Sequence, residues 1–242
     1  MKLNPLYLIH LYTASGGLFG IFALFYAADG NFYKSFIFLF ITLVIDGTDG
    51  MLARKYKVSK NLPNMDGVML DNVIDTMTYA WIPFLVMYKL NLFSPLWLCL
   101  PALGAMYCYT IADMKNDEGF FINFPTLWNL VALYFWLIKP NAIWCILVLI
   151  FLTVLSFLPT RYMYPSKQKF LQKTNFVLII IWVLSLFYIF IKKDFQNTSL
   201  IYFSLFIYPV FYMLGSFYVD YLYRFKKPLN SLRTRGGSSS RL

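Results

Sequence analysis

Histidine, cysteine and acidic residues are scarce in this sequence. One histidine, three cysteines and 11 acidic residues occur among 242 residues, and charged residues make up only 13%. Because hydrophobic residues reach 60% and aromatic residues 21%, the composition excludes an ordinary soluble domain. The single histidine, His10, also excludes a histidine-based catalytic relay, and we expect it to be a packing residue.

Sequence features of thiolate metal sites and of many transporters are missing as well. The cysteines, Cys99, Cys108 and Cys145, show no spacing typical of a metal site, so we expect buried free thiols. No internal repeat is recognisable in the sequence, which argues against the inverted-repeat architecture of secondary transporters.

Long apolar runs dominate what the sequence does contain. Eight of them are able to span a bilayer, although the fifth and sixth are short for a hydrocarbon core about 30 Å thick. We therefore predict an all-α integral membrane protein with about eight transmembrane helices. The predicted spans are residues 6–28, 32–50, 68–88, 93–112, 124–138, 141–158, 175–191 and 198–222. In the first span, Gly16 and Gly20 form a G-x-x-x-G pattern typical of close helix packing.

The positive charge follows the predicted topology. A net charge of +10 is compatible with nucleic-acid binding, but the distribution of the basic residues along the chain indicates membrane topology instead. With eight spans and a cytoplasmic N-terminus, 16 of the 21 Lys and Arg residues fall in cytoplasmic segments. The bias predicts that both termini are cytoplasmic and that the partners of the basic surface are membrane lipids, not nucleic acid.

The chain is expected to form one membrane domain, residues 1–228, followed by a disordered tail, residues 229–242. The tail contains a Gly-Gly-Ser-Ser-Ser run that is typical of an added linker. The polar segment 54–67 is expected to be a bend between the second and third spans, and 113–123 and 159–174 are expected to be cytoplasmic loops.

Four aspartates lie inside otherwise apolar stretches. A carboxylate at membrane depth costs about 2.5–3.5 kcal/mol, so four in close succession indicate function. Asp46 and Asp49 are three residues apart, whereas Asp71 and Asp75 are four apart, so each pair projects from one face of a helix. Two such helices side by side would offer four hard oxygen ligands, which suits Mg²⁺ or Mn²⁺ with a phosphate-bearing substrate.

Small and basic residues share the faces that carry these acids. On the second span, Gly50, Ala53 and Arg54 continue the stripe of Asp46 and Asp49. Small residues allow a substrate to approach the backbone closely, and an arginine can hold phosphate oxygens bidentately. On the third span, Gly67 precedes the two acids at the same face.

Together these residues form the pattern D-x-x-D-G-x-x-A-R…G-x-x-x-D-x-x-x-D, which resembles that of the CDP-alcohol phosphatidyltransferases. One departure is the spacer between Arg54 and Gly67, which has twelve residues where most members have eight or nine. This longer spacer resembles the bacterial phosphatidylcholine synthase branch, as do His10–Gly16, Asp117–Asn129 and Arg161–Ser166. The resemblance covers most of residues 8–167.

The resemblance implies an inner-membrane enzyme, with its active site facing the cytoplasm, that transfers the phosphatidyl group of CDP-diacylglycerol to free choline and releases CMP. It implies two divalent ions, Mn²⁺ in this branch, and a homodimer. The metal ligands would be Asp46, Asp49, Asp71 and Asp75, with Asp75 also the base that deprotonates choline. CDP-diacylglycerol would be bound by Gly50, Ala53, Arg54, Gly67 and Thr13; the place of His10 beside Thr13 also allows it to contact the nucleotide.

The acceptor and lipid sites are predicted from chemistry. Because a quaternary ammonium cannot donate a hydrogen bond, aromatic faces with a nearby carboxylate are its natural partners. The choline candidates are Tyr79, Trp128, Glu118, Asp117 and Tyr12. Arg161 and Lys167 are candidates for contact with the lipid phosphate.

Two alternatives stay open. The same transfer to serine, glycerol phosphate or inositol keeps the chemistry, although the twelve-residue spacer argues against it. A cation or proton transporter would use the intramembrane acids, but it does not require the small residues and Arg54 at fixed offsets.

Overall fold

The computed structural model describes residues 4–62, 64–111, 120–164 and 172–226. The chain divides into two compact units. The first contains residues 1–110 and 126–154, and the second contains residues 111–125 and 155–242. The predicted tail, residues 229–242, lies outside the described residues.

The described part of the first unit consists of helices joined by short turns and loops. Its α-helices are α1 (Tyr7–Ala28), α2 (Phe32–Lys55), α3 (Val58–Asn61), α4 (Gly67–Asp75), α5 (Ile82–Leu90), α6 (Cys99–Thr110), α7 (Trp128–Ile138) and most of α8 (Ala142–Phe157). A π-helical turn, Thr76–Trp81, joins α4 to α5, and a 3₁₀ turn, Pro95–Leu98, precedes α6. The predicted bend at 54–67 therefore contains one short helix, α3.

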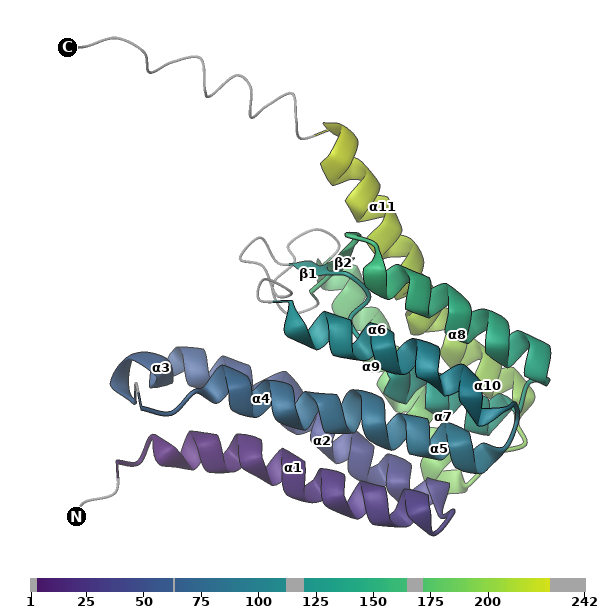
Figure 1. Ribbon diagram of the computed structural model, residues 1–242, viewed down its shortest axis with the longest axis horizontal. Helices are drawn as coiled ribbons and strands as arrows, with labels where there is room; N and C mark the ends of the chain where they lie inside the picture. Colours follow the sequence, from purple (N-terminus) through teal and green to yellow (C-terminus); the bar gives the residue numbers. More distant parts are fainter. Residues whose placement is uncertain (1–3, 63, 112–119, 165–171, 227–242) are drawn as a thin grey trace. The chain divides into compact units, whose positions relative to one another are not determined.

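Helix α1 packs along α2 and along the continuous α4–α5 segment (Figure 1). Small residues allow this contact: a Cβ at Gly16 would lie 3.4 Å from Ile45 Cγ2, and one at Gly20 would lie 3.0 Å from Thr78 Cγ2. The predicted G-x-x-x-G packing is confirmed. The buried Ser35 hydroxyl adds a 2.9 Å hydrogen bond from α2 to the Ala23 carbonyl of α1. These contacts hold α2 and the α4–α5 segment against the same helix, α1.

The start of α4 is fixed by its own sequence. Asp66 is the N-cap, and its Oδ1 accepts hydrogen bonds from Val68 N and Met69 N, both at 3.0 Å. This cap satisfies two of the backbone donors that a helix leaves free at its N-terminus. The helix therefore begins at Gly67 and presents Asp71 and Asp75 on its next two turns.

The second unit combines helices with a small sheet. It contains β1 (Phe120–Ile122), β2 (Arg161–Met163), α9 (Gln172–Lys192), α10 (Thr198–Leu205), a π-helical turn (Phe206–Val210) and α11 (Phe211–Lys226). The strands pair antiparallel, with Phe120 opposite Met163 and Ile122 opposite Arg161. The prediction of loops at these two places was wrong for the six strand residues. Strand β2 is tied to α11 by a 3.1 Å hydrogen bond from Met163 N to Ser216 Oγ.

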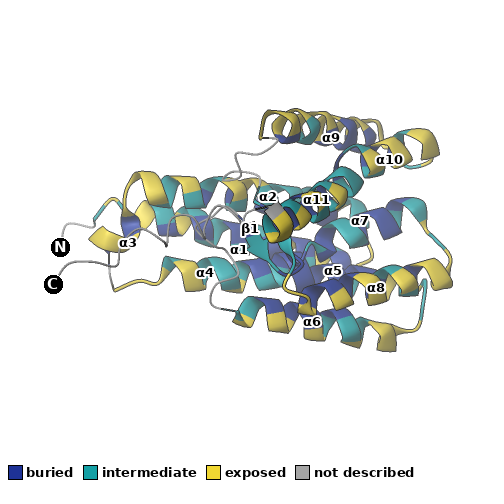
Figure 2. Ribbon diagram, turned by 90° about the horizontal axis from the view of Figure 1, so that it is seen from above, coloured by how far each residue is buried: buried dark blue, intermediate teal, exposed yellow. Residues whose placement is uncertain are grey.

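Helices of both units expose apolar side chains, as expected of lipid-facing surfaces (Figure 2). Four described helical segments are long and apolar enough to cross a membrane: Tyr7–Ala28, Phe32–Lys55, Gln172–Lys192 and Thr198–Phe225. Helices α7 and α8 are apolar but shorter. The fold is thus a helical membrane protein, and the count of eight spans stays a prediction.

The cysteine prediction is confirmed only in part. Cys108 and Cys145 are buried free thiols, whereas Cys99 is exposed at the start of α6. The first residue of that helix follows a short 3₁₀ turn that has no buried residues, which explains why Cys99 is uncovered.

Candidate metal centre

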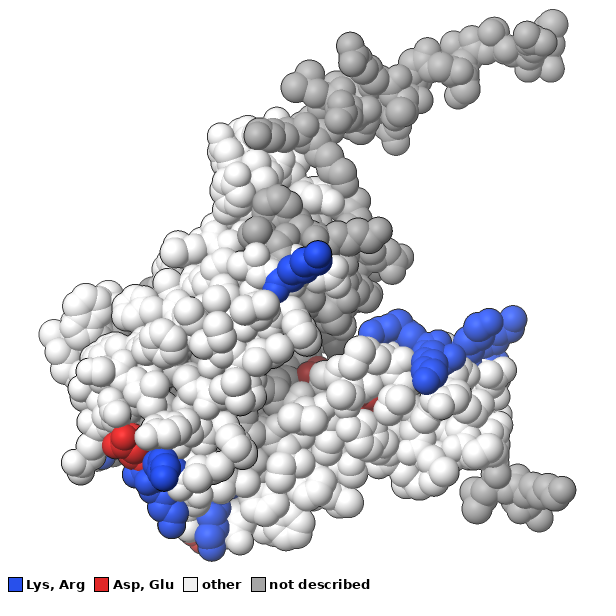
Figure 3. Space-filling view, turned by 180° about the vertical axis from the view of Figure 1, so that it is seen from behind, with Lys and Arg blue, Asp and Glu red and all other residues white. Residues whose placement is uncertain are grey.

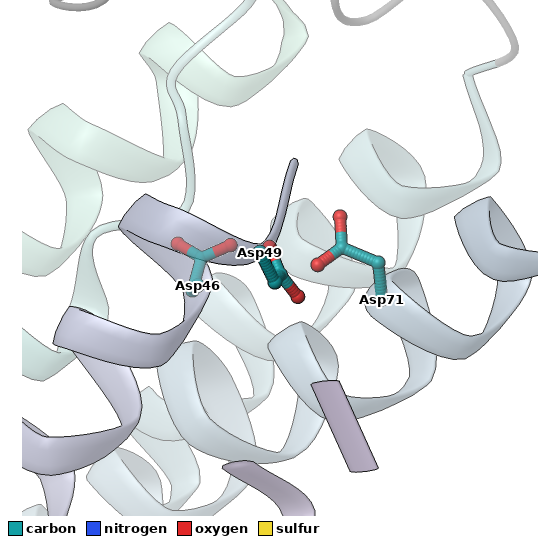
Figure 4. Close-up of side chains that lie close together, drawn as sticks. All are labelled: Asp46, Asp49 and Asp71. Carbon is teal, nitrogen blue, oxygen red and sulfur yellow. The ribbon is translucent and has the colours of Figure 1, made fainter. Parts of the chain in front are cut away.

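Three aspartate side chains converge from two helices of the first unit. Asp46 and Asp49 come from α2 and Asp71 from α4, and one carboxylate oxygen of each lies within 4.8 Å of the others. Figure 4 shows Asp49 between the other two, with the Asp71 carboxylate directed toward it from α4. The spacing of three residues on α2 places both of its acids on the face that meets α4.

Asp75 borders the same small cavity but does not belong to this group of three. The cavity has a volume of about 10 Å³, and Asp46, Asp49, Asp71 and Asp75 all line it. Its remaining walls are Thr13 and Gly16 of α1, Thr42 and Ile45 of α2, Ile74 of α4 and Thr78 of the π-helical turn. A volume of this size holds about one water molecule or one small ion. All four predicted acids therefore meet at one cavity.

Neighbouring hydroxyl groups orient the carboxylates. The Tyr79 hydroxyl donates a 2.7 Å hydrogen bond to Asp46 Oδ2. Thr13 of α1 lies within hydrogen-bonding reach of the Asp49 carboxylate. Asp49 and Asp75 are both buried, with exposed fractions of 5% and 7%. Buried carboxylates are stable only with hydrogen-bond donors or a cation beside them.

The donor set fits a divalent cation. Carboxylate oxygens are the ligands that Mg²⁺ and Mn²⁺ prefer. Oxygens on opposite sides of a Mg²⁺ ion lie about 4.2 Å apart, given bonds of about 2.1 Å. Oxygens on adjacent sides lie closer, about 3.0 Å apart, so the observed group, whose oxygens lie within 4.8 Å of one another, would contract around a single bound ion.

A basic group stands at the end of α2, one turn beyond the acids. The Arg54 guanidinium lies over Gly50, since a Cβ at Gly50 would be 3.2 Å from Arg54 Nη1. Arg54, Lys55, Lys57 and Lys60 are all exposed. Figure 3 shows Lys and Arg side chains gathered at the end of the molecule where α2 leads into α3. The predicted stripe from acids through small residues to a cation is present on α2, and Ala53 lies half-buried within it.

Gly67 lies against α1. A Cβ at Gly67 would be 2.8 Å from His10 Cε1 and 3.3 Å from His10 Nδ1. The bare backbone of this glycine therefore accommodates the imidazole of the only histidine in the chain.

The choline candidates differ in accessibility. Trp128 is completely buried and packs on Phe84 with ring centroids 5.8 Å apart, and Tyr79 is 7% exposed. Tyr12 is half-buried, and its hydroxyl lies 2.7 Å from Thr48 Oγ1. Asp117 and Glu118 lie outside the described residues, as does the lipid-phosphate candidate Lys167.

The other lipid-phosphate candidate, Arg161, belongs to the second unit and has a protein partner there. Its Nη1 lies 3.3 Å from Asp220 Oδ1, and Arg224 Nε donates a 2.7 Å hydrogen bond to Asp220 Oδ2. Arg224 also donates to the Pro159 carbonyl at 2.7 Å. Sequence reasoning missed Asp220, although it is an acid in an apolar span and stands four residues before an arginine. The first of these features, an acid in an apolar span, is the one that singled out the other aspartates.

The fold and this site define a class: a helical membrane protein with a carboxylate centre suited to a divalent cation. Residues 10–211 match the CDP-alcohol phosphatidyltransferase family, so the chain belongs to that family. The match includes every residue of the acidic cluster and its stripe.

Curated relatives with the name phosphatidylcholine synthase are similar over most of their length. The Borreliella burgdorferi protein is 31% identical over 221 residues, which cover 89% of this chain and 94% of the relative. The Legionella bozemanae protein is 32% identical over 84% of this chain and 98% of its own length, and the Rhizobium johnstonii protein is 32% identical over 81% and 83%. No solved structure matches this chain.

Proposed function

We propose that this protein is a phosphatidylcholine synthase that transfers the phosphatidyl group of CDP-diacylglycerol to free choline, with CMP as the second product. The observation that carries the proposal is the meeting of Asp46, Asp49, Asp71 and Asp75 at one cavity. The relatives of the same name, which match nearly end to end, support choline as the acceptor.

The four aspartates would have two different roles, cation binding and proton transfer. A cation held by Asp46, Asp49 and Asp71 would neutralise the diphosphate and stabilise CMP as it leaves. Asp75 would accept the proton of the choline hydroxyl while the choline oxygen attacks the phosphorus of the phosphatidyl group. The new P–O bond forms as the bond to the CMP oxygen breaks, so no covalent enzyme intermediate is needed.

Other side chains would bind and orient the substrates. Arg54 stands one turn beyond Gly50, where its guanidinium can hold phosphate oxygens. The Tyr79 hydroxyl would keep the Asp46 carboxylate in a fixed orientation. Among the choline candidates, Tyr79 has its hydroxyl on the acidic cluster, so we infer that the quaternary ammonium binds near this ring.

Finer features of the proposal rest on the resemblance and on charge distribution. They are two Mn²⁺ ions, a homodimer, eight spans in a bacterial inner membrane, cytoplasmic termini and an active site facing the cytoplasm. The exposed lysines and arginine next to the site at the end of α2 support the last of these, because basic residues favour the cytoplasmic side.

The test is CMP release by the purified protein with CDP-diacylglycerol, Mn²⁺ and a panel of alcohols: choline, serine, glycerol phosphate and inositol. We expect CMP release with choline only. Release with serine, and not with choline, would change the proposed acceptor from choline to serine and leave the type of transfer reaction unchanged. Absence of release with every alcohol would reject the transferase and favour transport.

A further inference from the structure

His10 carries an unused polar atom beside the candidate site. Its side chain is buried, with 6% exposed, and its Nε2 has no hydrogen-bond partner among the described residues. The Nδ1–Cε1 side of the ring lies on Gly67, where a Cβ would be 2.8 Å from His10 Cε1, 3.3 Å from Nδ1 and 4.0 Å from Nε2. The proposed mechanism assigns no role to this residue.

Packing alone does not account for a histidine at this position. A buried polar atom without a partner loses its hydration and gains nothing in return. Phenylalanine would cover the bare backbone of Gly67 with a ring of similar width and no such loss. The nitrogen therefore points to a ligand that supplies the missing hydrogen bond.

The position of His10 indicates which part of a substrate it meets. Along α4, Gly67, Asp71 and Asp75 follow one another at intervals of four residues, about 6 Å per step. If Asp71 is at the diphosphate and Asp75 at the acceptor hydroxyl, the nucleoside lies on the other side of the diphosphate, next to Gly67. Thr13, one turn after His10 on α1, already borders the acidic cavity.

We propose that His10 is a nucleotide-binding residue whose Nε2 hydrogen-bonds the cytidine part of CDP-diacylglycerol. The ring turns about its Cα–Cβ bond to make this contact, which uncovers Gly67 for the nucleoside. Gly67 has no side chain that would block either position of the ring. This inference rests on the proposed function and adds a residue of α1 to its nucleotide site.

The test compares His10→Phe and His10→Gln with wild type in the CMP-release assay. His10→Phe keeps a ring against Gly67 and removes the nitrogen, so the KM for CDP-diacylglycerol should rise about tenfold, while the KM for choline stays within twofold. His10→Gln keeps a polar group and should recover most of the loss. Ser15→Ala removes another polar side chain of α1, bonded to the Tyr12 carbonyl at 2.6 Å, and should leave both constants within twofold.

Direct binding of CMP with Mn²⁺ to the purified variants gives a second readout. His10→Phe should weaken CMP binding about tenfold without lowering the unfolding temperature in detergent. Wild-type values of both the KM and the CMP affinity in His10→Phe would overturn the proposal. If His10→Phe does not fold, an unaltered CMP affinity in His10→Ala overturns it instead. Wild-type protein that binds CMP but releases none with any alcohol would reject the proposed function. In that case the CMP affinities of wild type and His10→Phe would still test whether His10 binds the nucleotide.

Discussion

The Tyr79 hydroxyl donates a 2.7 Å hydrogen bond to Oδ2 of Asp46, and this bond joins the π-helical turn after α4 to the acidic face of α2. Single π-helical turns inside α-helices are frequent at functional sites, because the extra residue redirects a side chain. Here the π-helical turn comes directly after Asp75, the proposed base, and contains Tyr79, whose hydroxyl orients Asp46.

Tyr79→Phe should weaken metal binding. Loss of a hydrogen bond to a metal-binding carboxylate typically costs about 10–100-fold in affinity or activity. We expect the Mn²⁺ concentration for half-maximal CMP release to rise at least tenfold. Tyr88→Phe alters an exposed tyrosine of α5 and should change nothing. Equal Mn²⁺ dependence in the two variants would show that the Tyr79 bond is dispensable.

Asp75→Asn should abolish turnover and leave CDP-diacylglycerol binding measurable. The amide keeps the shape of the side chain but cannot accept the choline proton. Asp75 also lies outside the group of three oxygens within 4.8 Å, so binding of the cation should survive. Turnover is measured as CMP release and binding with labelled CDP-diacylglycerol. Near-normal turnover would remove Asp75 as the base.

Trp128→Ala should act through stability. The ring is completely buried against Phe84, and removal of a buried aromatic side chain costs about 3–5 kcal/mol. The unfolding temperature in detergent should fall, and the KM values for choline and CDP-diacylglycerol should change by similar factors. A selective rise in the KM for choline, with unchanged thermal stability, would instead place Trp128 in the choline site.

Asp220→Asn should loosen the second unit without acting on the acidic cluster. Asp220 is the common partner of Arg161 and Arg224, and its side chain is only 10% exposed. Because both arginines are partly exposed, we expect a loss of about 1 kcal/mol, or a fall of about 2–4 °C in Tm. Asp29→Asn changes an exposed acid and is the matched control. Identical Tm values for the two variants would contradict a structural role for Asp220.

Much of the helical architecture follows from the sequence. Each predicted span contains a helix, because apolar runs of this length leave the backbone no alternative to internal hydrogen bonds. The convergence of Asp46, Asp49 and Asp71 was also predictable, since helical spacing alone aligns acids on facing helices. Asp75 was predicted to join them and lies at the same cavity.

Features that depend on contacts distant in sequence were missed. Phe120–Ile122 and Arg161–Met163 are too short to show alternation, and their pairing is set by the surrounding helices. The contact of His10 with Gly67 requires α1 to lie against the start of α4, which neither segment reveals alone. Asp66 was predicted only as part of the bend at 54–67, because an aspartate before a glycine is as typical of a turn as of a helix N-cap.

The central claim is that the aspartates of α2 and α4 bind a divalent cation together. Direct measurement of Mn²⁺ binding to purified wild type and to Asp46→Asn, Asp49→Asn and Asp71→Asn tests it without reliance on turnover. We predict that each substitution weakens Mn²⁺ binding at least tenfold and that excess chelator abolishes CMP release until Mn²⁺ is restored. Wild-type Mn²⁺ affinity in all three variants would contradict the account.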